Sequence, residues 1–247
     1  TLKLNFKEKK QKKKKEDEKA DSVPQLNFIN LTLQAANPQE VNRPLRILTS
    51  QPLASIDNDG INLSIKIDTV WEKIPNIRLI PDSTGKVLNF TINNKWEPGG
   101  KYKLEIDSAA IVGIYDEWNK PFKQEFSVRA NEDYTNLFFS VSGTDQPLVV
   151  ELLNNSDKVV ATAPVIDGTA SFRYMLPGTF YARAFIDSNN NGIYDTGNIA
   201  QKLQPEEIYY YPKKINARKN WDIEQSWNIY EQPLDLQKPL DIKKNKP

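Results

Sequence analysis

The sequence contains neither cysteine nor histidine among its 247 residues. Without cysteine there are no disulfide bonds or thiol nucleophiles, and without histidine there is no histidine-based acid–base catalysis or serine–histidine triad. Both absences together exclude the common structural zinc sites. No run of 18 apolar residues occurs, so the sequence predicts no membrane-spanning helix. Because no initiator methionine or signal peptide precedes Thr1, we expect a fragment whose export signal or lipid anchor would lie upstream.

The chain as a whole also lacks a strong net charge, because its formal net charge is only +1. The distribution is uneven, since residues 1–20 hold nine lysines and four acidic residues and the remainder is mildly acidic. The segment from Lys7 to Lys19 has no apolar residue, which predicts a solvated segment. Its alternative role is contact with an anionic lipid or polymer. The mildly acidic remainder argues against a nucleic-acid partner.

Short alternating segments separated by turn residues dominate the rest of the chain. Residues 61–67 (INLSIKI) show the period of two that is typical of a strand with one buried face. The other candidate strands are residues 2–6, 26–33 with a bulge near Ile29, 45–49, 76–80, 87–92, 102–106, 122–128, 137–141, 148–153, 159–163, 170–176, 180–186, 208–211 and 221–229. Such spacing predicts an all-β chain that forms two antiparallel Ig-like or prealbumin-like β-sandwiches in tandem.

The strand pattern is interrupted near residues 130–134, where a polar stretch indicates a domain boundary. We therefore expect four parts. Residues 1–40 form an N-terminal segment with the Lys-rich loop, and residues 41–130 form an Ig-like β-sandwich. Residues 131–231 form a prealbumin-like or B-repeat-like β-sandwich, and residues 232–247 form a Pro- and Lys-rich tail that we expect to be extended or disordered.

The sharpest motif is the stretch from Asp187 to Asp195, which reads D-x-N-x-N-G-x-x-D. This spacing matches the front of a calcium-binding loop, in which alternate residues direct oxygens at a hard cation. The predicted Ca²⁺ ligands are the side chains of Asp187, Asn189, Asn191 and Asp195 and the backbone carbonyl of Ile193.

Two features weaken the metal interpretation. The twelfth position, where an EF-hand loop has a bidentate glutamate, is Asn198, although Glu206 or Glu207 could close the coordination sphere. The loop also holds few charges, which predicts a dissociation constant of about 10⁻⁴–10⁻³ M. The alternative is a metal-free loop in which Asn and Asp side chains bond their own backbone.

Two sets of residues resemble known modules. The first set is Trp96-Glu97-Pro98-Gly99-Gly100-Lys101-Tyr102, Ile106-Asp107-Ser108, Tyr115-Asp116 and Asn119. It resembles the bacterial Ig-like module of the S-layer type, although the glycine before Asn119 is absent. The second set, which is Pro177-Gly178, Tyr181, residues 187–195 and Gly197, resembles the prealbumin-like or B-repeat-like sandwich of surface proteins. Over residues 40–230, their order is similar to the C-terminal part of Ig-like-domain envelope lipoproteins of Bacteroidota.

This resemblance implies an exported, lipid-anchored parent protein in the cell envelope, held at the outer membrane or cell surface. Its implied partners are other envelope proteins or glycan. Calcium binding in B-repeat-like modules carries over to Asp187, Asn189, Asn191, Ile193 and Asp195 alone.

No nucleophile motif, phosphate-binding loop or dinucleotide fingerprint occurs in the sequence, so we expect no enzymatic activity. The expected function is that of a structural or protein-interaction segment. The alternative is a carbohydrate-binding surface module that uses Tyr209, Tyr210, Tyr211, Trp221 and Trp227 as ring faces. Because aromatic residues favour strands, these rings could equally belong to the core.

Overall fold

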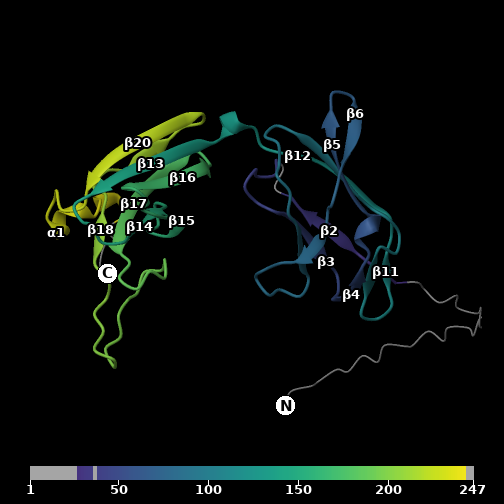
Figure 1. Ribbon diagram of the computed structural model, residues 1–247, viewed down its shortest axis with the longest axis horizontal. Helices are drawn as coiled ribbons and strands as arrows, with labels where there is room; N and C mark the ends of the chain where they lie inside the picture. The colour runs from purple at the N-terminus through teal and green to yellow at the C-terminus, as the bar shows by residue number, and fades with distance from the viewer. Residues whose placement is uncertain (1–26, 36–37, 243–247) are drawn as a thin grey trace, which may run out of the picture.

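The computed structural model describes residues 27–35 and 38–242, and Figure 1 shows a chain built almost entirely of strands. The predicted all-β fold is confirmed. The strands of the N-terminal half are β1 (Phe28–Ile29), β2 (Leu31–Gln34), β3 (Leu45–Thr49), β4 (Leu53–Ile56), β5 (Ile61–Ile67), β6 (Val70–Ile74), β7 (Leu79–Pro81), β8 (Asn89–Ile92), β9 (Lys101–Ile106), β10 (Ile111–Gly113), β11 (Trp118–Asn119) and β12 (Phe122–Ser127).

The C-terminal half continues with strands and short helical turns. Its strands are β13 (Thr135–Ser142), β14 (Leu148–Leu153), β15 (Val159–Pro164), β16 (Thr169–Met175), β17 (Gly178–Ile186), β18 (Ile208–Tyr210), β19 (Ile215–Ala217) and β20 (Trp221–Asn228). The helical turns among the described residues are η1 (Asn58–Gly60), η2 (Asn131–Asp133), α1 (Leu234–Gln237) and η3 (Leu240–Ile242). In the described part of the chain, no helix combines the length and the apolar character needed to cross a membrane.

The strands form five sheets. In the N-terminal half the strand orders are β2-β3-β8-β7, β1-β11-β10-β4 and β12-β9-β5-β6. In the C-terminal half the orders are β16-β13-β20 and β15-β14-β17-β18, with β19 paired to β17. Most pairs are antiparallel as predicted, but β13 pairs with β20 in parallel along its whole length, and β1 pairs with β11 in parallel. These two parallel pairs depart from the predicted antiparallel pairing, while the other strand pairs follow it. Parallel neighbours need a long connection, which the chain between β13 and β20 supplies.

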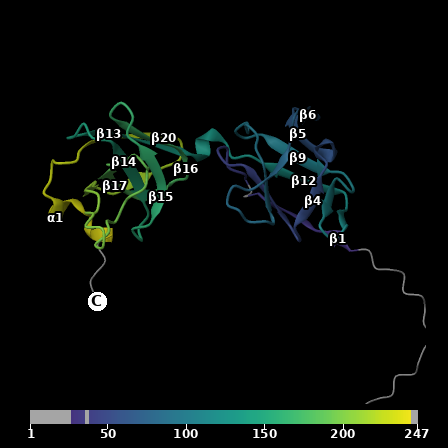
Figure 2. The same cartoon turned by 60° about the horizontal axis from the view of Figure 1, so that its bottom comes forward.

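Buried apolar residues form two large clusters that share no residue. One cluster is drawn from residues 29–128 and the other from residues 137–229. Figures 1 and 2 show the strands of the two clusters side by side along the long axis, with η2 between them. The division into separately folding domains at residues 41–130 and 131–231 stays a prediction.

Two aromatic residues of the first resemblance motif, Trp96 and Tyr102, lie in the N-terminal cluster. Trp96 packs edge-on against Tyr102 with 5.0 Å between ring centroids, and Phe126 lies 5.6 Å from Trp96. The Trp96 indole N–H donates to the carbonyl of Arg43 at 2.8 Å. A Cβ at Gly100 would stand 2.8 Å from the Tyr102 ring, so only glycine fits there. This motif therefore serves packing.

Several local expectations need correction. The bulge predicted near Ile29 is instead a change of sheet, because β1 pairs with β11 and β2 pairs with β3. The extended or disordered tail is also wrong for residues 234–242, which form α1 and η3. There Ile242 is buried against Leu153 and Tyr181, so burial of an apolar side chain fixes the segment. The predicted strand at residues 2–6 and the Lys-rich segment fall outside the described residues.

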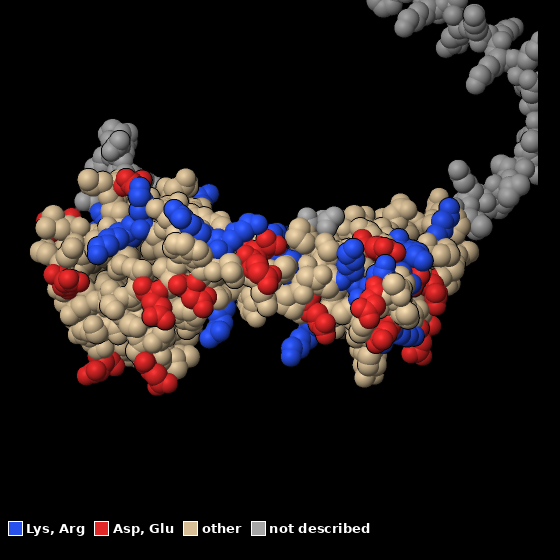
Figure 3. All heavy atoms as spheres, turned by 90° about the horizontal axis from the view of Figure 1, so that it is seen from above, with Lys and Arg blue, Asp and Glu red and all other residues tan. Residues whose placement is uncertain are grey.

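Charged side chains of both signs are interspersed over the face seen in Figure 3. Ion pairs form among the charged residues of the chain, and the carboxylate of Glu105 lies 2.8 Å from Lys103 and 3.0 Å from Lys123. Hydrogen bonds from these two lysines lower the pKa of Glu105 below its ordinary value. Because these groups are near solvent, such pairs contribute little to stability.

Candidate functional site

The predicted calcium loop begins where β17 ends, and it extends away from the sheet before the chain returns in β18 (Figure 1). Its first residue, Asp187, is anchored to the sandwich because its backbone N–H donates to the carbonyl of Pro147 at 2.9 Å. The Asp187 side chain is buried, with 5% of the residue exposed. A buried carboxylate needs hydrogen-bond donors, and the loop itself supplies them.

Both oxygens of the Asp187 carboxylate accept backbone hydrogen bonds from the loop. The N–H of Asn191 donates to Oδ1 at 3.0 Å, and the N–H of Gly192 donates to Oδ2 at 2.9 Å. The turn that brings these amides back uses a left-handed backbone at Asn190 (φ +58°) and Gly192 (φ +73°). Asparagine and glycine tolerate that conformation best, so the sequence encodes this turn locally.

The second carboxylate of the motif, Asp195, accepts hydrogen bonds from the two asparagines that the motif predicts as ligands. Its Oδ2 accepts from Asn189 Nδ2 at 2.6 Å and from Asn191 Nδ2 at 3.1 Å. The amide oxygens of the same asparagines accept backbone N–H groups, with Asn189 Oδ1 bonded to Asn191 N and Asn191 Oδ1 bonded to Ile193 N. The structure thus brings Asn189, Asn191 and Asp195 together as the motif predicts.

Glu206 closes the loop from outside the motif. Its Oε1 accepts from the backbone N–H and hydroxyl of Ser188 at 3.0 and 3.1 Å, and its Oε2 accepts from the backbone N–H of Asp195 at 3.0 Å. Of the two downstream glutamates that the sequence offered, Glu207 instead accepts from the Tyr209 hydroxyl at 2.7 Å. The twelfth position, Asn198, lies in a separate turn with Leu203.

Ile193 contributes no side-chain ligand, and 67% of the residue is exposed. Its proposed role is through the backbone carbonyl, which stays a prediction. Its neighbour Tyr194 holds the loop to the sheet, because its ring packs 5.7 Å from the ring of Phe185 and lies 5.6 Å from the guanidinium of Arg183.

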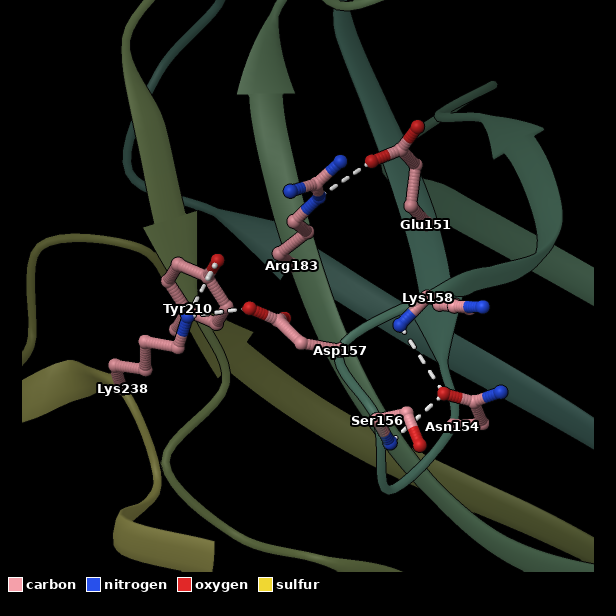
Figure 4. Close-up of polar contacts among 8 residues, drawn as sticks. All are labelled: Glu151, Asn154, Ser156, Asp157, Lys158, Arg183, Tyr210 and Lys238. Carbon is pink, nitrogen blue, oxygen red and sulfur yellow. Dashed lines mark hydrogen bonds and ion pairs between the residues drawn. The ribbon is translucent and has the colours of Figure 1, made fainter. Parts of the chain in front are cut away.

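Arg183 connects this loop to a polar network on the outer face of β14, β17 and β18, shown in Figure 4. Its Nε lies 2.5 Å from the Glu151 carboxylate. Partial burial lowers the pKa of Arg183, but the hydrogen bonds to Glu151 and Tyr210 outweigh it and raise that pKa overall. In the same figure Lys238 reaches the carboxylate of Asp157 at 2.5 Å and the hydroxyl of Tyr210 at 3.3 Å. Lys238 thereby ties the C-terminal segment to the turn that holds Asp157 and to Tyr210 of β18.

The donor set of the loop consists of oxygens, which suits a hard cation such as Ca²⁺. Within residues 27–35 and 38–242, no three Asp, Glu, His or Cys residues are gathered closely enough to hold a metal by themselves. In the arrangement described, two amide nitrogens face Asp195 where a cation would need oxygens. Rotation of the Asn189 and Asn191 amides would present oxygen there, at the cost of the bonds that their oxygens now accept from the backbone N–H groups of Asn191 and Ile193.

The aromatic residues that the sequence offered for glycan binding separate into two groups. Tyr209, Tyr211 and Trp227 are buried in the C-terminal cluster, where the rings of Tyr211 and Trp227 pack 5.6 Å apart. Burial raises the pKa of Tyr209, with a further contribution from its bond to Glu207. These three rings cannot meet a sugar. Tyr210 lies under Lys238, whereas Trp221 is 53% exposed.

Comparison with known proteins gives no family assignment, because no protein-family model and no curated protein matches the chain. Among solved structures, the chain is similar to the Bacillus anthracis TIE protein, with 12% identity and a TM-score of 0.25 over 84% of this chain and 41% of that one. It is similar to the N-terminal part of the bacterial S-layer protein SbsC, with 11% identity and a TM-score of 0.32 over 65% and 41%.

A third similar structure is a variant of BcpA, the major pilin subunit of Bacillus cereus, with 10% identity and a TM-score of 0.28 over 81% of this chain and 70% of that one. The chain spans less than half the length of the first two proteins. At these identities and TM-scores the likeness carries no argument about function.

Proposed function

We propose that this chain is a non-catalytic structural or protein-interaction segment of an exported cell-envelope protein, and that calcium stabilises its Asp187 loop. The observation that supports the calcium proposal is that Asn189 and Asn191 both bond the Asp195 carboxylate, in a loop that Asp187 and Glu206 hold through its backbone N–H groups. Placement in the envelope, at the outer membrane or cell surface, rests on the resemblance of the sequence motifs.

A bound cation would act on stability. It would coordinate side-chain oxygens that now accept hydrogen bonds from N–H groups of the loop, and it would fix the connection between β17 and β18. The loop holds two aspartates, and the carboxylate of Glu206 accepts from the backbone N–H of one of them, Asp195. Binding to the folded state alone raises the free energy of unfolding by about 1.4–2.7 kcal/mol at calcium concentrations of roughly 10–100 times the dissociation constant.

The test is thermal unfolding of the full chain with calcium, with magnesium and with a chelator. We expect calcium at millimolar concentration to raise the melting temperature, and magnesium to do so less because it demands a stricter geometry. Asp187→Ala should abolish the gain, and Glu206→Gln should reduce it. Asp145→Ala is the matched control, because Asp145 is an exposed aspartate outside the loop. If the protein is well folded and its melting temperature does not change with calcium, the metal proposal is contradicted.

A further inference from the structure

A polar cleft of about 400 Å³ lies on the C-terminal sandwich, away from the Asp187 loop. We call it the Tyr174 cleft, and its walls include Tyr134, Asn136, Arg173, Tyr174, Trp221 and Asp222. All six residues come from the three-stranded sheet β16-β13-β20 or from the turn that leads into it. Its volume falls within the range of about 300–1,000 Å³ that is typical of small-ligand sites.

A break in the register between β13 and β16 places Tyr174 in this cleft. Thr135 pairs with Met175 and Leu137 pairs with Phe172, so Arg173 and Tyr174 together oppose the single residue Asn136. This is a β-bulge, which re-aims side chains and occurs often beside functional sites. Tyr174 has a left-handed backbone with φ of +57°. A bulky residue is strained there, whereas glycine would not be.

The strained residue is held firmly by its neighbours. Its backbone N–H donates to Asn136 Oδ1 at 3.1 Å, and Asn136 Nδ2 in turn donates to Asp222 Oδ1 at 2.7 Å. The ring of Tyr174 packs edge-on against the buried ring of Tyr134 with 5.5 Å between centroids. Despite these contacts 38% of Tyr174 stays exposed. The fold therefore fixes a ring at the surface in a conformation that its residue type disfavours.

Trp221 supplies a second exposed ring on the other side of the same central strand. β20 begins at Trp221, which pairs with Thr135 of β13, and the Thr135 hydroxyl donates to the Trp221 carbonyl at 2.8 Å. The guanidinium of Arg218 lies 5.3 Å from its ring. Because β16 and β20 flank β13, the backbones that carry the two rings are roughly 10 Å apart.

We propose that the Tyr174 cleft binds a neutral saccharide. Exposed rings of Tyr174 and Trp221 offer flat apolar surface to the C–H faces of sugar rings. The walls of the cleft also carry a carboxylate, an amide and a guanidinium, from Asp222, Asn136 and Arg173, which can accept from and donate to hydroxyl groups. The opposite charges of Asp222 and Arg173 offset each other, which favours an uncharged ligand. This site differs from the buried Tyr209, Tyr211 and Trp227 that the sequence suggested.

The deciding variant is Tyr174→Gly in the full chain. It removes the ring, with its packing against Tyr134, and also the backbone strain, so the two effects on stability offset each other and the fold should be kept. A loss of retention by a folded variant would then report contact with the ligand. Affinity electrophoresis in gels that contain soluble neutral polysaccharides, namely mannan, xylan and β-glucan, measures retention. We expect retention by at least one of them, weakened about tenfold or more by Tyr174→Gly, a loss equivalent to about 1.4 kcal/mol. Trp221→Ala should weaken retention similarly.

Tyr115→Ala is the matched control, since Tyr115 is an exposed tyrosine outside the cleft. Its retention should equal that of the unaltered chain. The proposal would be overturned if none of the neutral polysaccharides retained the unaltered chain. Retention that both cleft variants keep would also overturn it. Retention by uronate polymers alone, lost at high salt, would assign binding to charge, for instance of the Lys-rich segment, and not to the cleft. None of these results depends on calcium binding at the Asp187 loop.

Discussion

Lys238 lies 2.5 Å from the carboxylate of Asp157, a residue 81 positions earlier in the chain. Partial burial lowers the pKa of Lys238, but its bonds to Asp157 and Tyr210 outweigh this and raise that pKa above the ordinary lysine value. The ion pair fixes the C-terminal segment to the turn between β14 and β15. The segment therefore packs on the strands of the C-terminal half, although its sequence resembles a tail.

The first prediction concerns the apolar end of this segment. Ile242 is 3% exposed and packs against Leu153 and Tyr181. Ile242→Ala should lower the free energy of unfolding by about 2 kcal/mol, because it removes buried methyl groups at the margin of the core. Leu240→Ala is the control, since Leu240 is 79% exposed and should change stability by less than about 0.5 kcal/mol. Urea unfolding measures both, and equal effects would contradict docking of the segment.

The second prediction concerns Asn119, a residue of the first resemblance motif. Its side chain is fully buried and bonds three backbone groups, donating to the carbonyls of Asp107 and Lys120 and accepting from the N–H of Ile111. Asn119→Ala leaves these groups without partners and should cost about 3 kcal/mol. The exposed Asn93→Ala should be nearly neutral in the same urea titration. If Asn119→Ala left the free energy of unfolding unchanged, the Asn119 side chain would not stabilise this turn.

The third prediction concerns alkaline pH. Burial raises the pKa of Tyr102, Tyr209 and Tyr211 above 10.0 in the folded protein. A raised pKa means that the folded state keeps protons that the unfolded state loses. This contribution to stability is therefore complete below about pH 10 and is lost as the pH rises above it. Tyrosinate absorbance should rise in two phases, with the second coinciding with loss of the circular dichroism of the sheets. Ionisation of all tyrosines near pH 10 without unfolding would contradict it.

The fourth prediction concerns the domain division. The two buried clusters share no residue, and η2 at Asn131–Asp133 lies between them in the sequence. Residues 131–247, expressed alone, should fold cooperatively and give the same amide chemical shifts as in the full chain. Shifts should differ near Tyr134, because its hydroxyl accepts from the backbone N–H of Val41 at 3.0 Å. A fragment without cooperative unfolding would contradict the division.

Local patterns predicted most strands well. The predicted strands at residues 45–49, 61–67 and 148–153 coincide with β3, β5 and β14. The missed strands β4, β6, β10, β11 and β19 have five residues or fewer, and β11 has two. Over such lengths alternation cannot be distinguished from chance. The bulge expected at Ile29 failed for another reason, because a change of sheet produces the same break in phase.

By itself, the sequence determined the all-β fold and the internal bonding of the loop from Asp187 to Asp195, because strand alternation and Asx turns depend on residues a few positions apart. Tertiary structure decided that Glu206, 11 residues beyond Asp195, closes that loop. It also decided that Tyr209 is buried while Trp221 is exposed, and that Tyr174 faces Asn136 across a bulge. These outcomes depend on which strands become neighbours, and a choice between distant partners leaves no periodic trace in the chain.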